Sequence, residues 1–152
     1  MKNIVLLTLL LITATTFSQR KRYKNITEKD GNIGIGTTTP DALLTVKGQI
    51  HTQEVQVDLN GAVAPDFVFE SYFEGKSLLL PSYQFPTLSE VEAFVKENHH
   101  LPGVPSAAEL EEDGISLKEM NLLLLQKIEE LTLYTLEQQL EIEKLKEAIK
   151  KE

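Results

Sequence analysis

The chain has 152 residues, a formal net charge of −8 and no cysteine. The absence of cysteine excludes disulfides, thiolate metal sites and a cysteine nucleophile. The acidic balance argues against a nucleic-acid partner, because phosphates need a basic face, and the length suits one ordinary domain or two small ones.

The first residues have the layout of a secretory signal peptide. Lys2 gives a positive start, and the apolar run over residues 4–17 is too short to span a bilayer comfortably. Small residues then precede Gln19. We expect residues 1–18 to be removed and the mature protein to be exported to the periplasm, the cell surface or the medium, without a transmembrane segment. An uncleaved anchor is the alternative.

Residues 19–31 are polar and without periodicity, so they are expected to be a flexible lead-in. The region 32–86 is predicted to be β-rich, because apolar and other residues alternate in its first half. Leu44 and Val46 are expected to share the inward face, opposite Thr45. The alternating segments are "IGIG" at 33–36, "LLTV" at 43–46 and "VQVDL" at 55–59, and "FVFESYF" at 67–73 could add a further strand.

The stretch "DGNIGIGTTTPDALLTVKG" at 30–48 has the closely spaced glycines of a phosphate-binding loop without its chemistry. A Walker loop needs lysine followed by serine or threonine, whereas Gly36 is followed by three threonines and Pro40. A dinucleotide fingerprint must open a helix, whereas Pro40 and the alternating "LLTV" continue as a strand. We interpret the glycines as positions of close backbone approach, as around a narrow oligomer axis.

From residue 87 the sequence turns helical. Ser89, Ser106 and Ser116 each precede a glutamate by three positions, which is the spacing of a capping box. These signals predict helices over about 90–98 and 107–113, and a long helix over 117–152.

The long helix has an unbroken heptad seam, typical of a coiled coil. Isoleucine at position a with leucine at position d favours parallel dimers, and the polar positions would fix the register. The seam consists of Asn121, Leu124, Ile128, Leu131, Thr135, Gln138, Ile142, Leu145 and Ile149. A second apolar row lies off the seam, at Leu122, Leu125, Leu133, Leu136 and Leu140. We expect the short helices at 90–113 to cover its upper part, or more than two long helices to meet.

No catalytic, cofactor or metal site is predicted. His99 and His100 are adjacent, so their side chains cannot face each other on a helix, and zinc would need further ligands. The aromatic segment 67–85 is the candidate for binding a glycan or protein partner, through Phe67, Phe69, Tyr72, Phe73 and Tyr83. The alternative is that these rings pack under the helices.

Two stretches resemble known proteins. "GNIGIGTTTPDALLTVKG" at 31–48 is similar to a motif of bacteriophage tail fibres and trimeric adhesins, where it forms intertwined β structure around a threefold axis. The segment 88–139, with "HLPGVPSA", "GISLKEMN" and "EELTLY" in order, resembles the C-terminal region of small secreted Bacteroidetes proteins and, more distantly, the endosialidase-type intramolecular chaperone. The autoproteolytic serine and lysine of that chaperone family have no matching motif between Leu59 and Thr87.

The resemblance implies a trimerisation end-piece that stays attached, in place of the dimer that the seam alone favours. The expected fold is α+β, with a short intertwined β region, small helices and a long, parallel, trimeric coiled-coil helix. The expected function is that of a non-enzymatic exported structural protein, like a tail fibre or adhesin. A cell-surface binding module and a self-cleaving enzyme are the alternatives.

Overall fold

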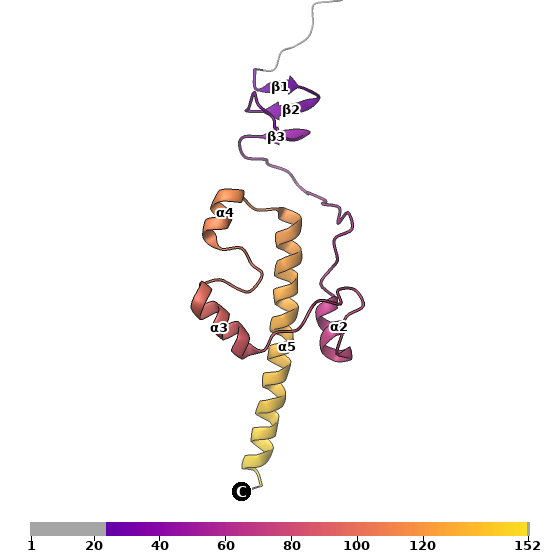
Figure 1. Ribbon diagram of the computed structural model, residues 1–152, viewed down its shortest axis with the longest axis vertical. Coiled ribbons are helices and arrows are strands. Elements are labelled where there is room, and N and C mark those ends of the chain that lie inside the picture. Colours follow the sequence, from indigo (N-terminus) through magenta and orange to yellow (C-terminus); the bar gives the residue numbers. More distant parts are fainter. Residues whose placement is uncertain (1–23, 152) are drawn as a thin grey trace, which may run out of the picture. The chain divides into compact units, whose positions relative to one another are not determined.

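The computed structural model describes residues 24–151, so the predicted signal peptide and the first part of the lead-in lie outside the described residues. The chain divides into two units, one up to Val55 and one from Gln56 onward. Within the described residues, the first unit holds a three-stranded sheet and the second holds four helices (Figure 1). The predicted α+β class is confirmed.

The sheet has the order β1-β2-β3, with β1 at Ile26–Lys29, β2 at Asn32–Ile35 and β3 at Leu44–Val46. β1 and β2 are antiparallel, and β2 and β3 are parallel. Asp30 and Gly31 join β1 to β2 with φ values of 53° and 83°. Two residues with positive φ form the tight turn that matches the twist of a hairpin. The prediction of a flexible lead-in up to residue 31 is therefore wrong, because the Asp-Gly turn pairs its last part with β2.

The two faces of the sheet differ in character. Leu44 and Val46 share a face, as predicted, with Ile33 and Ile35 beside them on β2. Leu44 and Ile35 on this apolar face are exposed. Thr45, expected to point outward, is the buried residue instead. The reason is local: its hydroxyl accepts hydrogen bonds from the backbone N–H groups of Asp41 and Ala42, and donates to the Asp41 carboxylate at 2.7 Å.

Gly34 and Gly36 of the stretch 30–48 are required by close backbone approach within the chain itself. A Cβ atom on Gly34 would lie 2.6 Å from the carbonyl oxygen of Thr37. At Gly36, φ is +73°, and a Cβ atom would lie 2.7 Å from the carbonyl oxygen of Lys47. Both distances are shorter than van der Waals contact allows. The loop after β2 therefore folds over the strand only because these positions lack a side chain.

Two predicted strands do not form. Residues 55–59, with Val55, Val57 and Leu59, are exposed and have no regular secondary structure. In the part of the chain that the structure describes, no strand pairs with this segment, and an unpaired strand is not stable in water. The segment "FVFESYF" forms the helix α2 at Phe67–Glu74, which ends at Gly75 with φ 78°. A short apolar run does not by itself distinguish strand from helix, and packing decides between them.

The remaining helices lie close to their predicted positions. α3 spans Leu88–Asn98, α4 spans Ala107–Asp113 and α5 spans Leu117–Ile149. The capping box of α4 uses Ser106 and Glu109, as predicted. In α3 the box is formed by Thr87 and Glu90, two residues earlier than Ser89 and Glu92, because both pairs have the required spacing and the chain uses the first.

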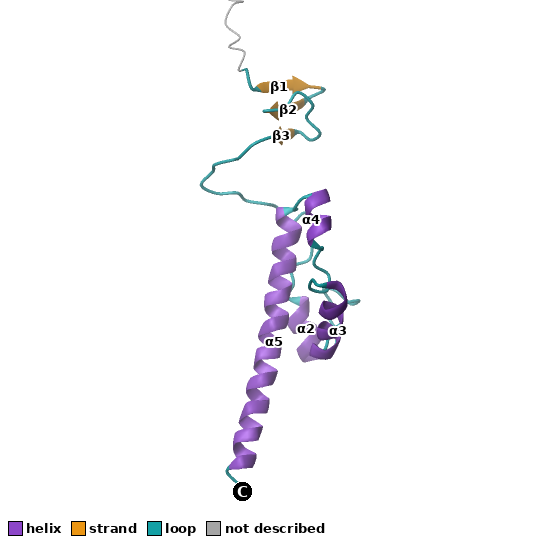
Figure 2. Cartoon of the chain, turned by 90° about the vertical axis from the view of Figure 1, so that its left-hand side faces the viewer, coloured by secondary structure: helices purple, strands orange, loops and turns teal. Residues whose placement is uncertain are grey.

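The core of the second unit lies between α2, the loop 75–86 and the middle of α5. Both views place α2 beside α5 (Figure 1 and Figure 2), and helix–helix contacts join the two. Phe67, Val68 and Leu133 are buried at its centre. α2 therefore takes the main covering role that was predicted for the helices at 90–113.

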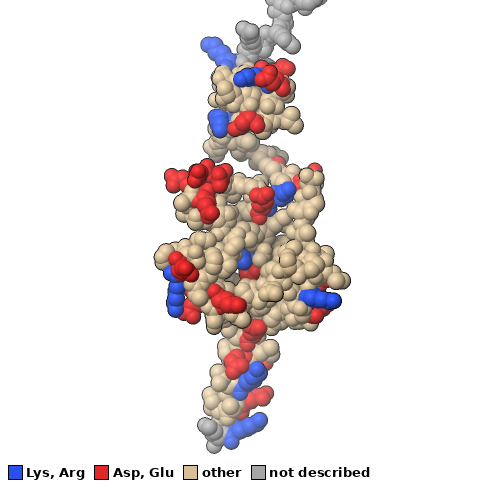
Figure 3. Space-filling model, viewed as in Figure 1, with Lys and Arg blue, Asp and Glu red and all other residues tan. Residues whose placement is uncertain are grey.

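α4 is strongly acidic, because four of its seven residues are glutamate or aspartate. Its sequence is "AAELEED", and Figure 3 shows acidic side chains gathered over it. A hollow of about 430 Å³ lies between α4 and the first turns of α5. Its lining combines the apolar Leu110, Met120 and Leu123 with Glu109, whose carboxylate accepts a hydrogen bond from the Ser106 backbone N–H at 2.7 Å. Glu109 is thus used in capping α4.

Candidate functional site

All positions of the predicted seam lie on an exposed face of α5. Its isoleucine and leucine side chains, from Leu124 to Ile149, are between 45% and 72% exposed. A soluble helix normally turns its apolar stripe toward a core. Among the described residues, the stripe with the heptad period is left uncovered along the whole of α5. The seam is therefore the candidate functional site.

The opposite face of α5 is covered by the chain itself. Leu133 is fully buried, whereas Leu131, two positions away, is 63% exposed. Residues two apart on an α-helix point about 200° apart, so these leucines lie on opposite sides. The middle of α5 thus has one apolar face used within the chain and one available outside it. The lower part of the off-seam row, Leu136 and Leu140, stays exposed.

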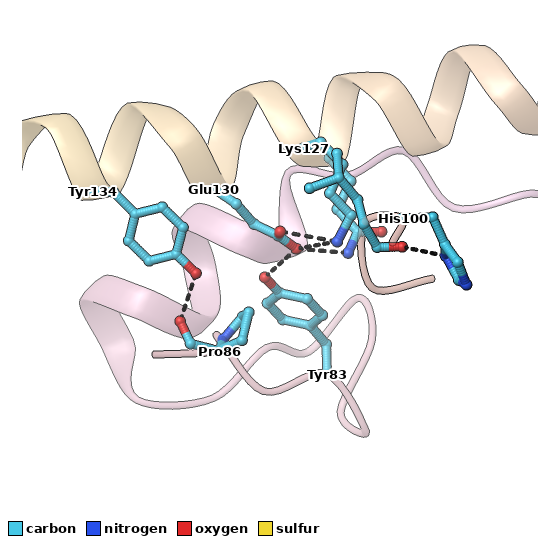
Figure 4. Close-up of polar contacts among 8 residues, drawn as sticks. Tyr83, Pro86, His100, Lys127, Glu130 and Tyr134 are labelled. Atoms are coloured by element: carbon cyan, nitrogen blue, oxygen red, sulfur yellow. Dashed lines mark hydrogen bonds and ion pairs between the residues drawn. The ribbon is translucent and has the colours of Figure 1, made fainter. Parts of the chain in front are cut away.

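A polar cluster holds the loop 75–86 against α5. The Tyr83 hydroxyl donates to Glu130 Oε1 at 3.0 Å, and Lys127 Nζ lies 2.9 Å from Glu130 Oε2 (Figure 4). Both members of the ion pair are nearly buried. A buried ion pair that also receives hydrogen bonds fixes geometry more than it adds stability. Because Lys127 and Glu130 both belong to α5, the hydrogen bond from Tyr83 is the contact by which this cluster joins the loop to the helix.

Tyr134 supplies a second attachment one turn further along α5. Its hydroxyl donates to the Pro86 carbonyl oxygen at 2.6 Å. Burial, followed by the charge of Glu130, raises the pKa of Tyr134 to about 12. Burial and Glu130 also raise the pKa of Tyr83. Both phenols therefore stay protonated at neutral pH and keep their donor role.

Glu129, next to Glu130 on α5, is the second buried carboxylate of this helix. It is buried, and among the described residues its Oε2 atom has no hydrogen-bond partner. Burial, followed by the negative charge of Asp66, raises the pKa of Glu129 above its ordinary value. The folded chain therefore binds this proton more tightly than the unfolded chain. Between the ordinary pKa and the raised one, the free energy of unfolding falls as pH rises.

We expect Glu129→Gln to raise the free energy of unfolding at pH 7 by an amount on the order of 1 kcal/mol, because a buried unpaired charge is removed. The variant should also lose the pH dependence that Glu129 contributes. Urea unfolding at several pH values measures both effects. Glu147→Gln, at an exposed position of the same helix, is the matched control. Equal stability of Glu129→Gln and the parent protein at pH 7 would contradict the prediction.

The aromatic residues predicted to contact a partner are mostly used inside the chain. Phe67 is buried, and Phe69, Tyr72 and Tyr83 pack around the core of the second unit. Phe73 alone of this group is exposed, at 69%. The alternative interpretation, that these rings pack under the helices, describes their positions better than a partner-binding loop does.

The functional residues that the pattern does not reveal are Lys127, Glu130 and Tyr134. Lys127 and Glu130 look like the solvated charges that flank a heptad seam, and Tyr134 lies beside it. Only contacts with residues far away in the sequence show their role. His99 ends α3 with φ 61°, in agreement with its predicted place at a helix end. Within residues 24–151, no group of three His, Asp or Glu side chains is placed to hold a metal ion.

The sheet of the first unit presents a second open apolar surface. Leu43 is 81% exposed, and Ile26, Ile35 and Leu44 are exposed as well. Among the described residues up to Val55, the buried ones are Gly34 and Thr45, so the sheet buries no apolar side chain. A sheet of this size without a hydrophobic core, a disulfide or a metal is not expected to be stable alone.

The chain matches no protein-family model, no curated protein and no solved structure. The similarity to tail-fibre proteins and to the chaperone family therefore stays a prediction from the sequence. In the part of the chain that the structure describes, no helix is both long and apolar enough to cross a membrane.

Proposed function

We propose that the protein is an exported, non-enzymatic structural protein that assembles as a homotrimer through parallel α5 helices, in the manner of tail fibres and adhesins. One observation carries this proposal: in the middle of α5 the heptad seam lies on the exposed face, while the opposite face is closed by α2 and the loop 75–86. A coiled coil in the oligomer covers that face, and the β unit forms a short stem.

The exposed apolar area favours assembly over a monomer. Each isoleucine or leucine of the seam gains on the order of 1 kcal/mol when its exposed part is buried. Two of the polar seam residues already donate a hydrogen bond to the backbone of α5. Asn121 Nδ2 donates to the Leu117 carbonyl oxygen at 2.7 Å, and Thr135 Oγ1 donates to the Leu131 carbonyl oxygen at 2.8 Å. They can enter the interface at a lower desolvation cost than unpaired donors.

The seam pattern by itself favours two helices, and two other considerations favour three. The first is the predicted similarity to trimeric fibre proteins. The second is the exposed apolar face of the sheet, which has no hydrophobic core of its own and needs a cover. Three copies held together by their α5 helices bring three such faces to a high local concentration.

Light scattering behind a size-exclusion column, on residues 19–152, tests the proposal. We expect a mass three times that of one chain. A mass of two chains would keep the coiled coil and remove the tail-fibre analogy for the sheet. A monomer at micromolar concentration would contradict the proposal, and the exposed seam would then need another explanation.

A further inference from the structure

A groove of about 330 Å³ runs beside the seam, between the segment 99–105 and α5. Leu101, 44% exposed, forms one side of it. The other side is formed by Leu124, Lys127, Ile128, Glu130 and Leu131 of α5. Leu124, Ile128 and Leu131 are also seam residues, so any partner that covers the seam must also fill or bridge this groove.

The groove suits an apolar occupant. Its only charged residues among the described lining are Lys127 and Glu130. These two are paired with each other and lie largely out of the solvent (Figure 4). His100, next to Leu101, contacts the Leu101 carbonyl oxygen through its ring nitrogen and packs edge-on against Phe94. An apolar side chain that enters the groove would therefore bury no unpaired charge of this lining.

The heptad shows which part of a second copy would enter. With Asn121 at position a, Lys127 is at position g, so the groove lies on the g side of the seam. The opposite flank, position e, carries Leu125, which is 43% exposed. In a parallel coiled coil the g flank of one helix meets the e flank of its neighbour. Two exposed leucines, Leu101 at the groove and Leu125 at position e, thus lie on the two sides of the same part of the seam.

We propose that the segment 99–105 belongs to the assembly interface, and that Leu101 contacts the e flank of α5 in a second copy of this chain, centred on Leu125. This inference rests on the proposed coiled coil and adds to it. Each chain supplies a groove on one flank and a leucine on the other, so the apolar face is wider than a seam of a and d positions alone. A wider face suits the three helices proposed above.

The natural absence of cysteine allows a direct test by disulfide formation in the full chain. Under mild oxidation, the variant Leu101→Cys/Leu125→Cys should link neighbouring chains into covalent oligomers. The number of chains in these oligomers should equal the number that light scattering measures for the parent protein. A closed ring of three chains would migrate as a trimer on a non-reducing gel. The variant Leu101→Cys/Leu136→Cys is the matched control, because Leu136 is an exposed leucine of α5 off the seam. It should give few links.

A second measurement covers the case in which the cysteine pair is poorly oriented. Leu101→Ser should raise the protein concentration at which half the assembly dissociates by about tenfold, because an interface leucine is lost. Leu78→Ser, at a 74% exposed position of the loop 75–86, should leave that concentration unchanged. An oligomer of unchanged affinity in Leu101→Ser, without interchain links in the double cysteine variant, would overturn this inference and leave the coiled coil intact. A monomeric parent protein would overturn both.

Discussion

Replacing Leu131 and Ile142 together with aspartate is expected to give monomers in which the end of α5 unfolds and part of the helical signal is lost. Both residues lie on the exposed seam, and two charges per chain would have to be buried between helices. Without assembly, the part of α5 beyond residue 137 is entirely exposed. An isolated helix of that length is marginal in water, so it should unfold. Light scattering and far-UV circular dichroism measure the two effects.

Leu136→Asp/Leu140→Asp is the control for this variant. It makes the same chemical change, on the same helix, at leucines that are also exposed but lie off the seam. A parallel coiled coil leaves these positions on its outside, so the control should remain an oligomer with nearly the parent helical signal. If both variants dissociate, or neither does, the seam is not the assembly surface.

Leu133→Ala is expected to lower the free energy of unfolding by about 2–5 kcal/mol, the cost of emptying a well-packed leucine site. Leu133 is fully buried against Phe67 and Val68, so its loss weakens the attachment of α2 to α5 inside each chain. The attachment orients the seam, but its strength does not depend on protein concentration. The melting temperature should therefore fall by the same amount in dilute and in concentrated samples.

Leu131→Ala provides the comparison, because it is the same substitution two residues away on the opposite side of α5. Its effect on the melting temperature should depend on protein concentration, since it weakens association and leaves the internal core intact. Thermal unfolding at two concentrations a hundredfold apart separates the two cases. A concentration-dependent effect of Leu133→Ala would mean that Leu133 also lies at an interface between chains.

The helix boundaries were predictable because the signals that set them are local. A serine or threonine and a glutamate three residues later can satisfy each other's backbone N–H groups, as at α4; at α5 only the Ser116 half of the predicted box forms, by accepting from the Glu119 N–H. This is why α4 begins at Ala107 as predicted. Where two such pairs overlap, at Thr87 and Ser89, local chemistry does not choose between them, and the predicted start of α3 was wrong by a few residues.

The segment 67–73 shows where local signals are insufficient. Its aromatic and β-branched residues favour a strand when taken alone. In the structure it is helical, because the helix places Phe67 and Val68 together against Leu133, a residue more than sixty positions away. The cluster of Tyr83, Lys127 and Glu130 was missed for the same reason, since its members come from the loop 75–86 and from α5.

The sequence by itself determined the α+β class, the starts of α4 and α5, the strands β2 and β3, and the residues that share one face of α5. Each follows from periodicity or from neighbours a few positions apart. Only the tertiary structure decided which apolar row of α5 is covered within the chain and which is left for a partner. Periodicity shows that Leu131 and Leu133 are both apolar and lie on different sides. Which of them is buried depends on where α2 and the loop 75–86 pack.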